Sequence, residues 1–281
     1  MNVSRLLSRR STVVGIAVVT TFGILALLAP WIAPYDPNRI DPAIGFASPS
    51  AAHWLGTDNL GRDILSRLLH GARWSLGLVL VATVMIMSCG VAVGAAAGYF
   101  GAVLDDVLMR LVDTVLSVPA LLLALAIVGT IGPGLGSLIL GLSSIWWVSY
   151  ARVVRGLVLA LRERACVDAA LALGATHRRV VVHHILPGIM PVVAVLATLE
   201  MGELVLAMSA LSFLGLGAQP PTPEWGAMLN DGRAYFSSAP QLLLYPGLAI
   251  TIAVMGFNLL GDGLRDAMDP TDAVHIKGIG A

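Results

Sequence analysis

Long apolar stretches alternate with short polar ones along almost the whole chain. A helix that crosses a membrane needs about 20 predominantly apolar residues. Six stretches fit this requirement, and we expect membrane-spanning helices at 13–33, 74–98, 111–131, 135–157, 188–214 and 241–261. The limits of the third and fourth are the least distinct, because Asp113, Pro119 and the run "GTIGPGLG" interrupt the pattern. The pattern predicts an all-α, polytopic membrane protein with six transmembrane helices.

Composition supports lipid as the natural solvent. Of the 281 residues, 57% are hydrophobic and only 12% are charged, whereas about a quarter of a soluble domain is charged. The formal net charge is zero, which argues against a nucleic-acid partner. The two cysteines, Cys89 and Cys166, form no disulfide framework or metal-ligand spacing.

The positive charges predict the orientation. Lys and Arg gather in cytoplasmic loops. With the N-terminus inside, twelve basic residues lie in the cytoplasm, namely Arg5, Arg9, Arg10, Arg110, Arg152, Arg155, Arg162, Arg164, Arg178, Arg179, Arg265 and Lys277. Five lie outside, namely Arg39, Arg62, Arg67, Arg73 and Arg233. We therefore expect both termini to be cytoplasmic. The first stretch exceeds the 7–15 apolar residues of a cleaved signal peptide, so we expect it to be retained.

Two outside segments are too long for simple connections. The first, 34–73, begins with a Pro- and Asp-rich loop and ends in "GRDILSRLLHGAR", where the spacing of the leucines predicts a short amphipathic helix. The second, 215–240, is rich in Pro and Gly and is typical of a fixed, re-entrant or capping loop. Either can be a solvated connection, but loops of this length are more often functional, and we favour docking or gating.

The polar segment 168–188, "DAALALGATHRRVVVHHILPG", interrupts the apolar pattern between the fourth and fifth spans. Residues 159–173 are strong helix formers. Gly174 suits the left-handed position after a helix, and Thr176 can cap a second helix. We expect Pro187 and Gly188 to end that second helix. A rigid helix–break–helix fits a membrane-surface connector and a docking element equally well.

The same segment resembles a known family. Asp168, Ala169, Ala170, Gly174, Leu186 and Pro187 match, without a gap, the cytoplasmic Glu-Ala-Ala…Gly…Leu-Pro pattern of binding-protein-dependent ABC importer permeases, with Asp in place of the usual Glu. The stretches 53–73, 211–229 and 258–270 are similar to the C-type permease subunit of dipeptide, oligopeptide and nickel importers. The resemblance covers nearly the whole chain.

The resemblance implies an organisation and a set of partners. The chain would consist of 1–33 (cytoplasmic N-terminus and first span), 34–73 (extracytoplasmic), 74–264 (a permease core with five spans, the cytoplasmic coupling segment 159–187 and the extracytoplasmic loop 215–240) and a cytoplasmic tail, 265–281. It would be a multi-pass protein of the bacterial inner membrane. A second permease subunit would complete a heterodimer, two ATPase subunits would bind ATP and Mg²⁺, and a substrate-binding protein would deliver cargo.

The coupling segment would contact the ATPase. The resemblance implies contact residues at Asp168, Ala169, Ala170, Gly174, Arg178, Arg179 and Pro187. Arg178 and Arg179 can form ion pairs with the ATPase or extend toward lipid headgroups. The chain contains no G-x-x-x-x-G-K-[ST] phosphate loop, so we expect a non-catalytic subunit without a cofactor of its own.

Glu200 and Glu203 are the candidate pore residues. A carboxylate in a span is costly and indicates function by default, and an i, i+3 pair lies on one helix face. The pair can form a polar patch on a cation or peptide-amine path, or bond to the partner subunit. Asp113 is more typical of a structural role, and the adjacent His183 and His184 point to different helix faces, so we expect no metal site.

The cargo is the least determined property. "LATLEMG" at 196–202 is similar to the nickel branch, so we favour nickel, free or chelated, over short peptides. A secondary transporter would show inverted repeats, which we do not find, and an intramembrane enzyme would need a catalytic motif that the spans lack.

Overall fold

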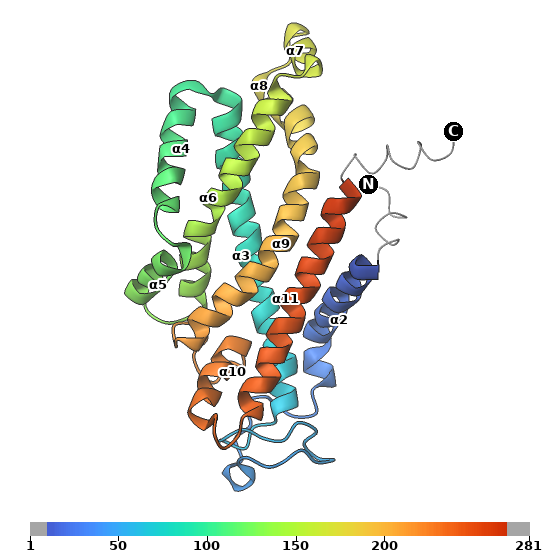
Figure 1. The fold of residues 1–281 in the computed structure, drawn as a ribbon, viewed down its shortest axis with the longest axis vertical. Coiled ribbons are helices and arrows are strands. Elements are labelled where there is room, and N and C mark those ends of the chain that lie inside the picture. Colours follow the sequence, from blue (N-terminus) through green and yellow to red (C-terminus); the bar gives the residue numbers. More distant parts are fainter. Residues whose placement is uncertain (1–9, 269–281) are drawn as a thin grey trace, which may run out of the picture.

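The computed structural model describes residues 10–268 as a bundle of long helices (Figure 1). The long helices are α2 (Arg10–Ile32), α3 (Ile64–Phe100), α4 (Ala102–Leu116), α5 (Ala120–Ile131), α6 (Leu135–Arg162), α9 (Leu186–Phe213) and α11 (Gln241–Met268). The short elements are α7 (Ala165–Ala172), α8 (His177–Val180), α10 (Trp225–Gly232), the 3₁₀ turns η1 (Pro42–Ile44) and η3 (Arg233–Tyr235), and the π turn η2 (Val181–Ile185).

The all-α prediction is confirmed, since no β-strand occurs between residues 10 and 268. Within this range five helices are long and apolar enough to cross a membrane, and α4 and α5 together make a sixth crossing if the bent pair is one span. The terminal residues Arg5, Arg9 and Lys277 of the orientation argument, and most of the predicted tail, lie outside the described residues.

The predicted third span, 111–131, is wrong as a single straight helix. The chain instead forms α4 and α5, which meet at an angle of 86°. The break falls at Ser117–Pro119, where α4 ends and Pro119 precedes the first residue of α5. Pro119 has no N–H to donate, and it disfavours the helical conformation for Val118, so the helix cannot continue through this point.

The predicted boundary between an amphipathic helix at 61–73 and a span from Trp74 is also wrong. One continuous helix of 37 residues, α3, covers both. Asp63 starts it by accepting a hydrogen bond from the Ser66 backbone N–H at 2.8 Å. At 1.5 Å per residue the helix is about 56 Å long, which exceeds the hydrocarbon core of about 30 Å. Part of α3 therefore extends beyond the membrane.

Glycines allow α3 and α6 to pack backbone against backbone. A Cβ on Gly90, Gly94 or Gly98 would lie 2.4, 2.5 or 2.8 Å from atoms of α6. These glycines recur every four residues and so lie on one side of the helix. In lipid, where burial of apolar surface does not drive helices together, such small residues let backbones approach and gain packing energy. The α3–α6 pair is thus a close backbone contact of the central bundle.

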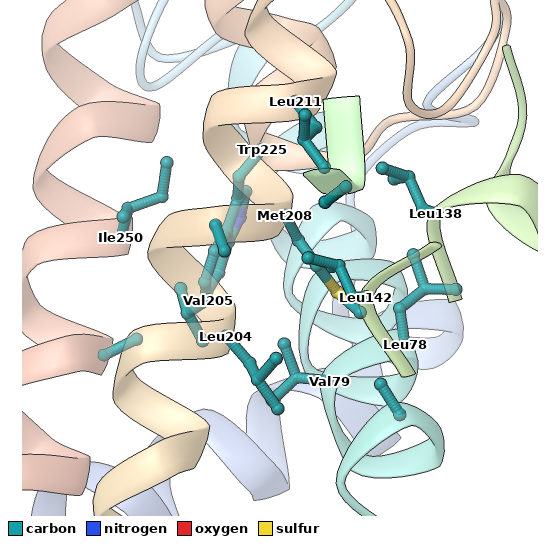
Figure 2. Close-up of a cluster of buried hydrophobic side chains, with 14 of the residues drawn as sticks. Leu78, Val79, Leu138, Leu142, Leu204, Val205, Met208, Leu211, Trp225 and Ile250 are labelled. Carbon is teal, nitrogen blue, oxygen red and sulfur yellow. The ribbon is translucent and has the colours of Figure 1, made fainter. Parts of the chain in front are cut away.

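Two buried clusters occupy opposite parts of the bundle. The larger one joins α3, α6, α9, α10 and α11, and Figure 2 shows Leu78, Leu142, Val205 and Met208 meeting at its centre. The smaller one lies toward α7 and α8 and includes Tyr99, Val167 and Val180. Figure 1 places α7 at one extreme of the molecule, and α10 with the loops at the other. The described ends of α2 and α11, Arg10 and Met268, point toward the α7 end.

The substitution Gly94→Val tests the α3–α6 contact. The new side chain would meet the Ala151 carbonyl and the Val154 side chain, so the helices must separate. We expect a loss of about 1–3 kcal/mol of stability, measured as a lower midpoint of thermal unfolding in detergent. Gly77→Val is the matched control, because a Cβ on Gly77 of the same helix has no neighbour within 4 Å. An equal loss in both variants would contradict the packing role.

Candidate coupling and translocation site

The segment from Ala165 to Val180 forms a protrusion in which α7 and α8 are joined by a tight turn at the predicted break. The first predicted helix, 159–173, is not continuous, because α6 ends at Arg162 and α7 begins at Ala165. Gly174 has φ +84°, the left-handed region that favours glycine. The Gly174 N–H donates to the Leu171 carbonyl at 2.9 Å, and the Ala175 N–H donates to the Ala170 carbonyl at 3.0 Å. This is the Schellman pattern of a helix C-terminus. Thr176 then caps α8 by accepting from the Arg179 N–H at 3.4 Å.

The α7–α8 protrusion has a polar outer side and an apolar inner side. Asp168, Ala169, Gly174, Arg178 and Arg179 are exposed. Leu173 is 89% exposed. Val167 and Val180 are buried in the smaller cluster, and Ala170 packs against it. The fixed inner side holds the outer side in a defined orientation, which a docking element requires.

Pro187 and Gly188 do not end the second helix, contrary to the prediction. The chain remains helical from His177 to Phe213. The π turn η2 lies directly before Pro187, and within it the Leu186 N–H donates to the carbonyl of Val181, five residues earlier. Proline in a regular helix clashes with the carbonyl four residues before it. The wider turn accommodates Pro187, which lies at the base of the protrusion and is exposed.

Glu200 and Glu203 lie on α9, well away in sequence from the protrusion. Glu200 is half-buried and Glu203 is exposed. On the same helix, the Leu196 carbonyl accepts a hydrogen bond from the hydroxyl of Tyr150 in α6 at 3.3 Å. Within residues 10–268 neither carboxylate makes a hydrogen bond or an ion pair.

Asp113 has the structural role that its position indicated, since it forms an ion pair with Arg152 of α6. A second pair that the sequence analysis did not identify joins the same helices. Arg155 of α6 donates to both carboxylate oxygens of Asp105 in α4 at 2.6 Å. Asp105 and Arg155 are 50 residues apart in sequence, so no local spacing could have indicated their contact.

His183 and His184, in the π turn η2 after the protrusion, are not grouped with other possible metal ligands. The His183 Nδ1 lies 3.2 Å from the Arg179 carbonyl of its own helix. Among residues 10–268 no three or more His, Cys, Asp or Glu side chains are arranged to hold a metal ion.

Comparison with known proteins settles the family. Residues 90–271 match the family described as binding-protein-dependent transport system inner membrane component. Residues 2–49 match the N-terminal transmembrane domain of oligopeptide transport permease C. The chain belongs to the ABC importer permeases of the peptide and nickel family.

Three relatives cover most of the permease. It is 43% identical to the nickel transport system permease protein NikC of Escherichia coli K12 over 94% of this chain and 95% of that one. It is 41% identical to the dipeptide transport system permease protein DppC of Alkalihalophilus pseudofirmus, over 95% of this chain and 88% of that one. It is 43% identical to the glutathione transport system permease protein GsiD of Escherichia coli O6:K15:H31, over 88% and 82%.

The fold has a counterpart among solved structures. A chain of the MetNI methionine ABC transporter, in inward-facing conformations, superposes with a TM-score of 0.56 at 21% identity. The match covers 72% of the permease and 97% of that chain. With several apolar helices and these relatives, the permease is a multi-pass protein of the inner membrane, and its family is that of non-catalytic permease subunits.

The end of the permease opposite the protrusion is closed by α10. The carboxylate of Glu224, 1% exposed, accepts hydrogen bonds from the Gly226 and Ala227 N–H groups at 2.9 Å. It also accepts one from the Ser75 hydroxyl of α3 at 3.0 Å. The indole N–H of Trp225 donates to the Leu68 carbonyl of α3 at 3.1 Å. The predicted loop 215–240 therefore contains a helix fixed to α3.

A network of buried charges fixes the start of α3 to the same end. The Arg62 Nε donates to Asp58 at 2.6 Å, and Arg62 and Arg67 lie 3.4 and 3.5 Å from Asp231. Both arginines are buried. Buried charges are tolerated only when they are paired and hydrogen-bonded. The network makes this end one rigid surface built from both predicted outside segments.

The substitution Glu224→Ala should destabilise this end. It would leave two backbone N–H groups and the Ser75 hydroxyl buried without an acceptor, at a cost of about 1–3 kcal/mol. We expect a lower midpoint of thermal unfolding in detergent, a smaller loss for Glu224→Gln, which keeps one oxygen, and none for Glu163→Ala at an exposed site. If Glu224→Ala and Glu224→Gln unfold at the same midpoint as Glu163→Ala, the hydrogen bonds of Glu224 do not stabilise the fold.

Proposed function

We propose that this permease forms one half of the translocation pore of an ATP-driven importer and that the α7–α8 protrusion transmits the state of the ATPase to the pore. The observation that carries the proposal is the rigid helix–Gly–helix geometry, with Asp168, Ala169, Gly174, Arg178 and Arg179 on its outer side. A second permease subunit completes the pore as a heterodimer. Two ATPase subunits bind below, and a substrate-binding protein docks on the opposite end.

The individual roles follow from chemistry. Asp168 supplies a charged or hydrogen-bonding contact to the ATPase. The exposed Ala169 lets the ATPase surface approach closely, and the half-buried Ala170 supports the protrusion from the inner side. Arg178 and Arg179 form ion pairs with the ATPase. Gly174 sets the bend, and Pro187 marks the base where the protrusion joins α9. ATP and Mg²⁺ are bound by the ATPase subunits, and this chain holds no cofactor.

The protrusion and both termini are cytoplasmic in this proposal. Arg162, Arg164, Arg178 and Arg179 all lie at the α7–α8 end, where cytoplasmic basic residues are expected. The described ends of α2 and α11 point the same way (Figure 1). The α10 end then faces outward, where a binding protein can reach it.

The cargo we favour is nickel, free or chelated, with short peptides as the alternative. Support comes from Glu200 and Glu203, which place two carboxylates without ion-pair partners among residues 10–268 on a spanning helix. A divalent cation or a peptide amine would be attracted to them. The NikC relative supports nickel, and the DppC and GsiD relatives, at similar identity, support the peptide alternative.

The substitution Gly174→Pro should uncouple transport. Proline requires φ of about −65°, but Gly174 has φ +84° and donates its N–H to Leu171. We expect normal membrane levels and continued ATP hydrolysis with loss of cargo uptake in proteoliposomes. Gly174→Asn is the matched control, because Asn tolerates the left-handed region and a Cβ at this position has no neighbour within 4 Å. Normal uptake by Gly174→Pro would exclude the coupling role.

The cargo is tested with the assembled complex and its own binding protein. ATP hydrolysis is measured in proteoliposomes with Ni²⁺, Ni²⁺ chelated by citrate, and di- to pentapeptides. We expect several-fold stimulation by one of the nickel forms. Stimulation by peptides alone would replace nickel with the peptide alternative and leave the coupling role intact.

A further inference from the structure

Both flanks of the α7–α8 protrusion meet at one residue, Tyr99. The Arg162 side chain, at the last position of α6 before the protrusion, donates from Nη1 to the Tyr99 carbonyl at 2.8 Å. The Tyr99 hydroxyl lies 2.7 Å from Nδ1 of His177, the first residue of α8. The two rings also make an edge contact, with centroids 5.7 Å apart and planes at 71°. The main chain of Tyr99 thus binds one flank, and its side chain binds the other.

Tyr99 belongs to the last turn of α3. Carbonyl groups in the last turn of a helix have no partner within the helix, and Arg162 supplies one. The Tyr99 side chain is 6% exposed and packs in the smaller cluster with Val167 and Val180, the two buried anchors of the protrusion. A buried hydroxyl needs a hydrogen-bond partner, and His177 is that partner. The contact is therefore built into the fold.

We propose that Tyr99 is the positioning residue that fastens the protrusion to α3, so that displacement of α7 and α8 moves α3. This inference depends on the proposed coupling function. The chain connects the protrusion directly only to α6 and α9, and the link to α9 passes through the π turn η2. The contacts of Tyr99 add a third connection, to a helix that precedes the protrusion in sequence by more than 60 residues.

The helix reached in this way extends through the whole permease. Gly94 and Gly98 hold the end of α3 that bears Tyr99 tightly against α6. At its other end, Ser75 and the Leu68 carbonyl bind Glu224 and Trp225. A displacement at Tyr99 is then transmitted by a packed, continuous helix to the end where a binding protein docks. A hinge-like switch needs such a rigid element between its two sites.

Loss of the Tyr99–His177 hydrogen bond should loosen this connection without unfolding the protein. Val167 and Val180 still anchor the protrusion, and Tyr99→Phe keeps the ring and the carbonyl that accepts from Arg162. In proteoliposomes containing the complete complex we expect basal ATP hydrolysis to persist. Stimulation by the cargo-loaded binding protein should fall about two- to tenfold, the effect of one hydrogen bond.

Variants at His177 separate positioning from stability. His177 is exposed, so its replacement is tolerated by the fold. His177→Leu should lower stimulation as Tyr99→Phe does, and the double variant should lower it no further, because both remove one bond. His177→Asn places an acceptor near the position of Nδ1 and should restore part of the stimulation. Tyr245→Phe, a half-buried tyrosine at the opposite end, is the matched control and should leave stimulation unchanged.

The outcomes distinguish this inference from the proposed function. If Gly174→Pro abolishes uptake but Tyr99→Phe and His177→Leu are stimulated like the wild type, Tyr99 has no positioning role and the coupling role remains. Additive losses in the double variant, or no recovery with His177→Asn, would also overturn it. If Gly174→Pro transports normally, the coupling function itself fails and the inference fails with it.

Discussion

The close contact of α3 with α6 is the interaction on which the rest of the structure depends. Without side chains at Gly90, Gly94 and Gly98, the two backbones approach to a distance that a single Cβ would prevent. Lipid tails are as apolar as leucine, so two spanning helices gain from association mainly through such packing. The contact ends one residue before Tyr99. Its geometry therefore brings Arg162 within reach of the Tyr99 carbonyl, and it sets where the protrusion begins.

Polar contacts then fix both ends of α3, where helices have backbone groups without partners. Asp63 caps the start of α3, and Glu224 binds Ser75 in its third turn. Arg162 satisfies a carbonyl of its last turn. Each of these contacts is buried or partly buried, so each is stronger than an exposed equivalent in water. The helix is held along its middle by packing and at its ends by hydrogen bonds, as a rigid connection between two surfaces requires.

The sequence predicted what depends on local chemistry. Apolar length identified the spanning segments, and the turn at Gly174 followed from glycine's access to positive φ. The sequence-based predictions failed where the structure depends on contacts between residues far apart in the chain. Pro119 lies at a helix break, whereas Pro187 lies in a continuous helix directly after a π turn. The partners of Glu224 and Tyr99 lie 149 and 78 residues away, and no spacing in a single sequence indicates such contacts.

The three relatives are named for different cargoes but are similar to this chain to nearly the same degree. Permeases named for nickel, dipeptide and glutathione transport are 43%, 41% and 43% identical to this chain. The overall identity to the three relatives therefore does not distinguish between their cargoes. The glycines of α3 at the α6 contact leave no room for a side chain, and the φ of +84° at Gly174 is strained for most residues other than Gly and Asn. Charged residues in a spanning helix are costly. Glu200 and Glu203 of α9 are therefore the first positions at which permeases with different cargoes should be compared.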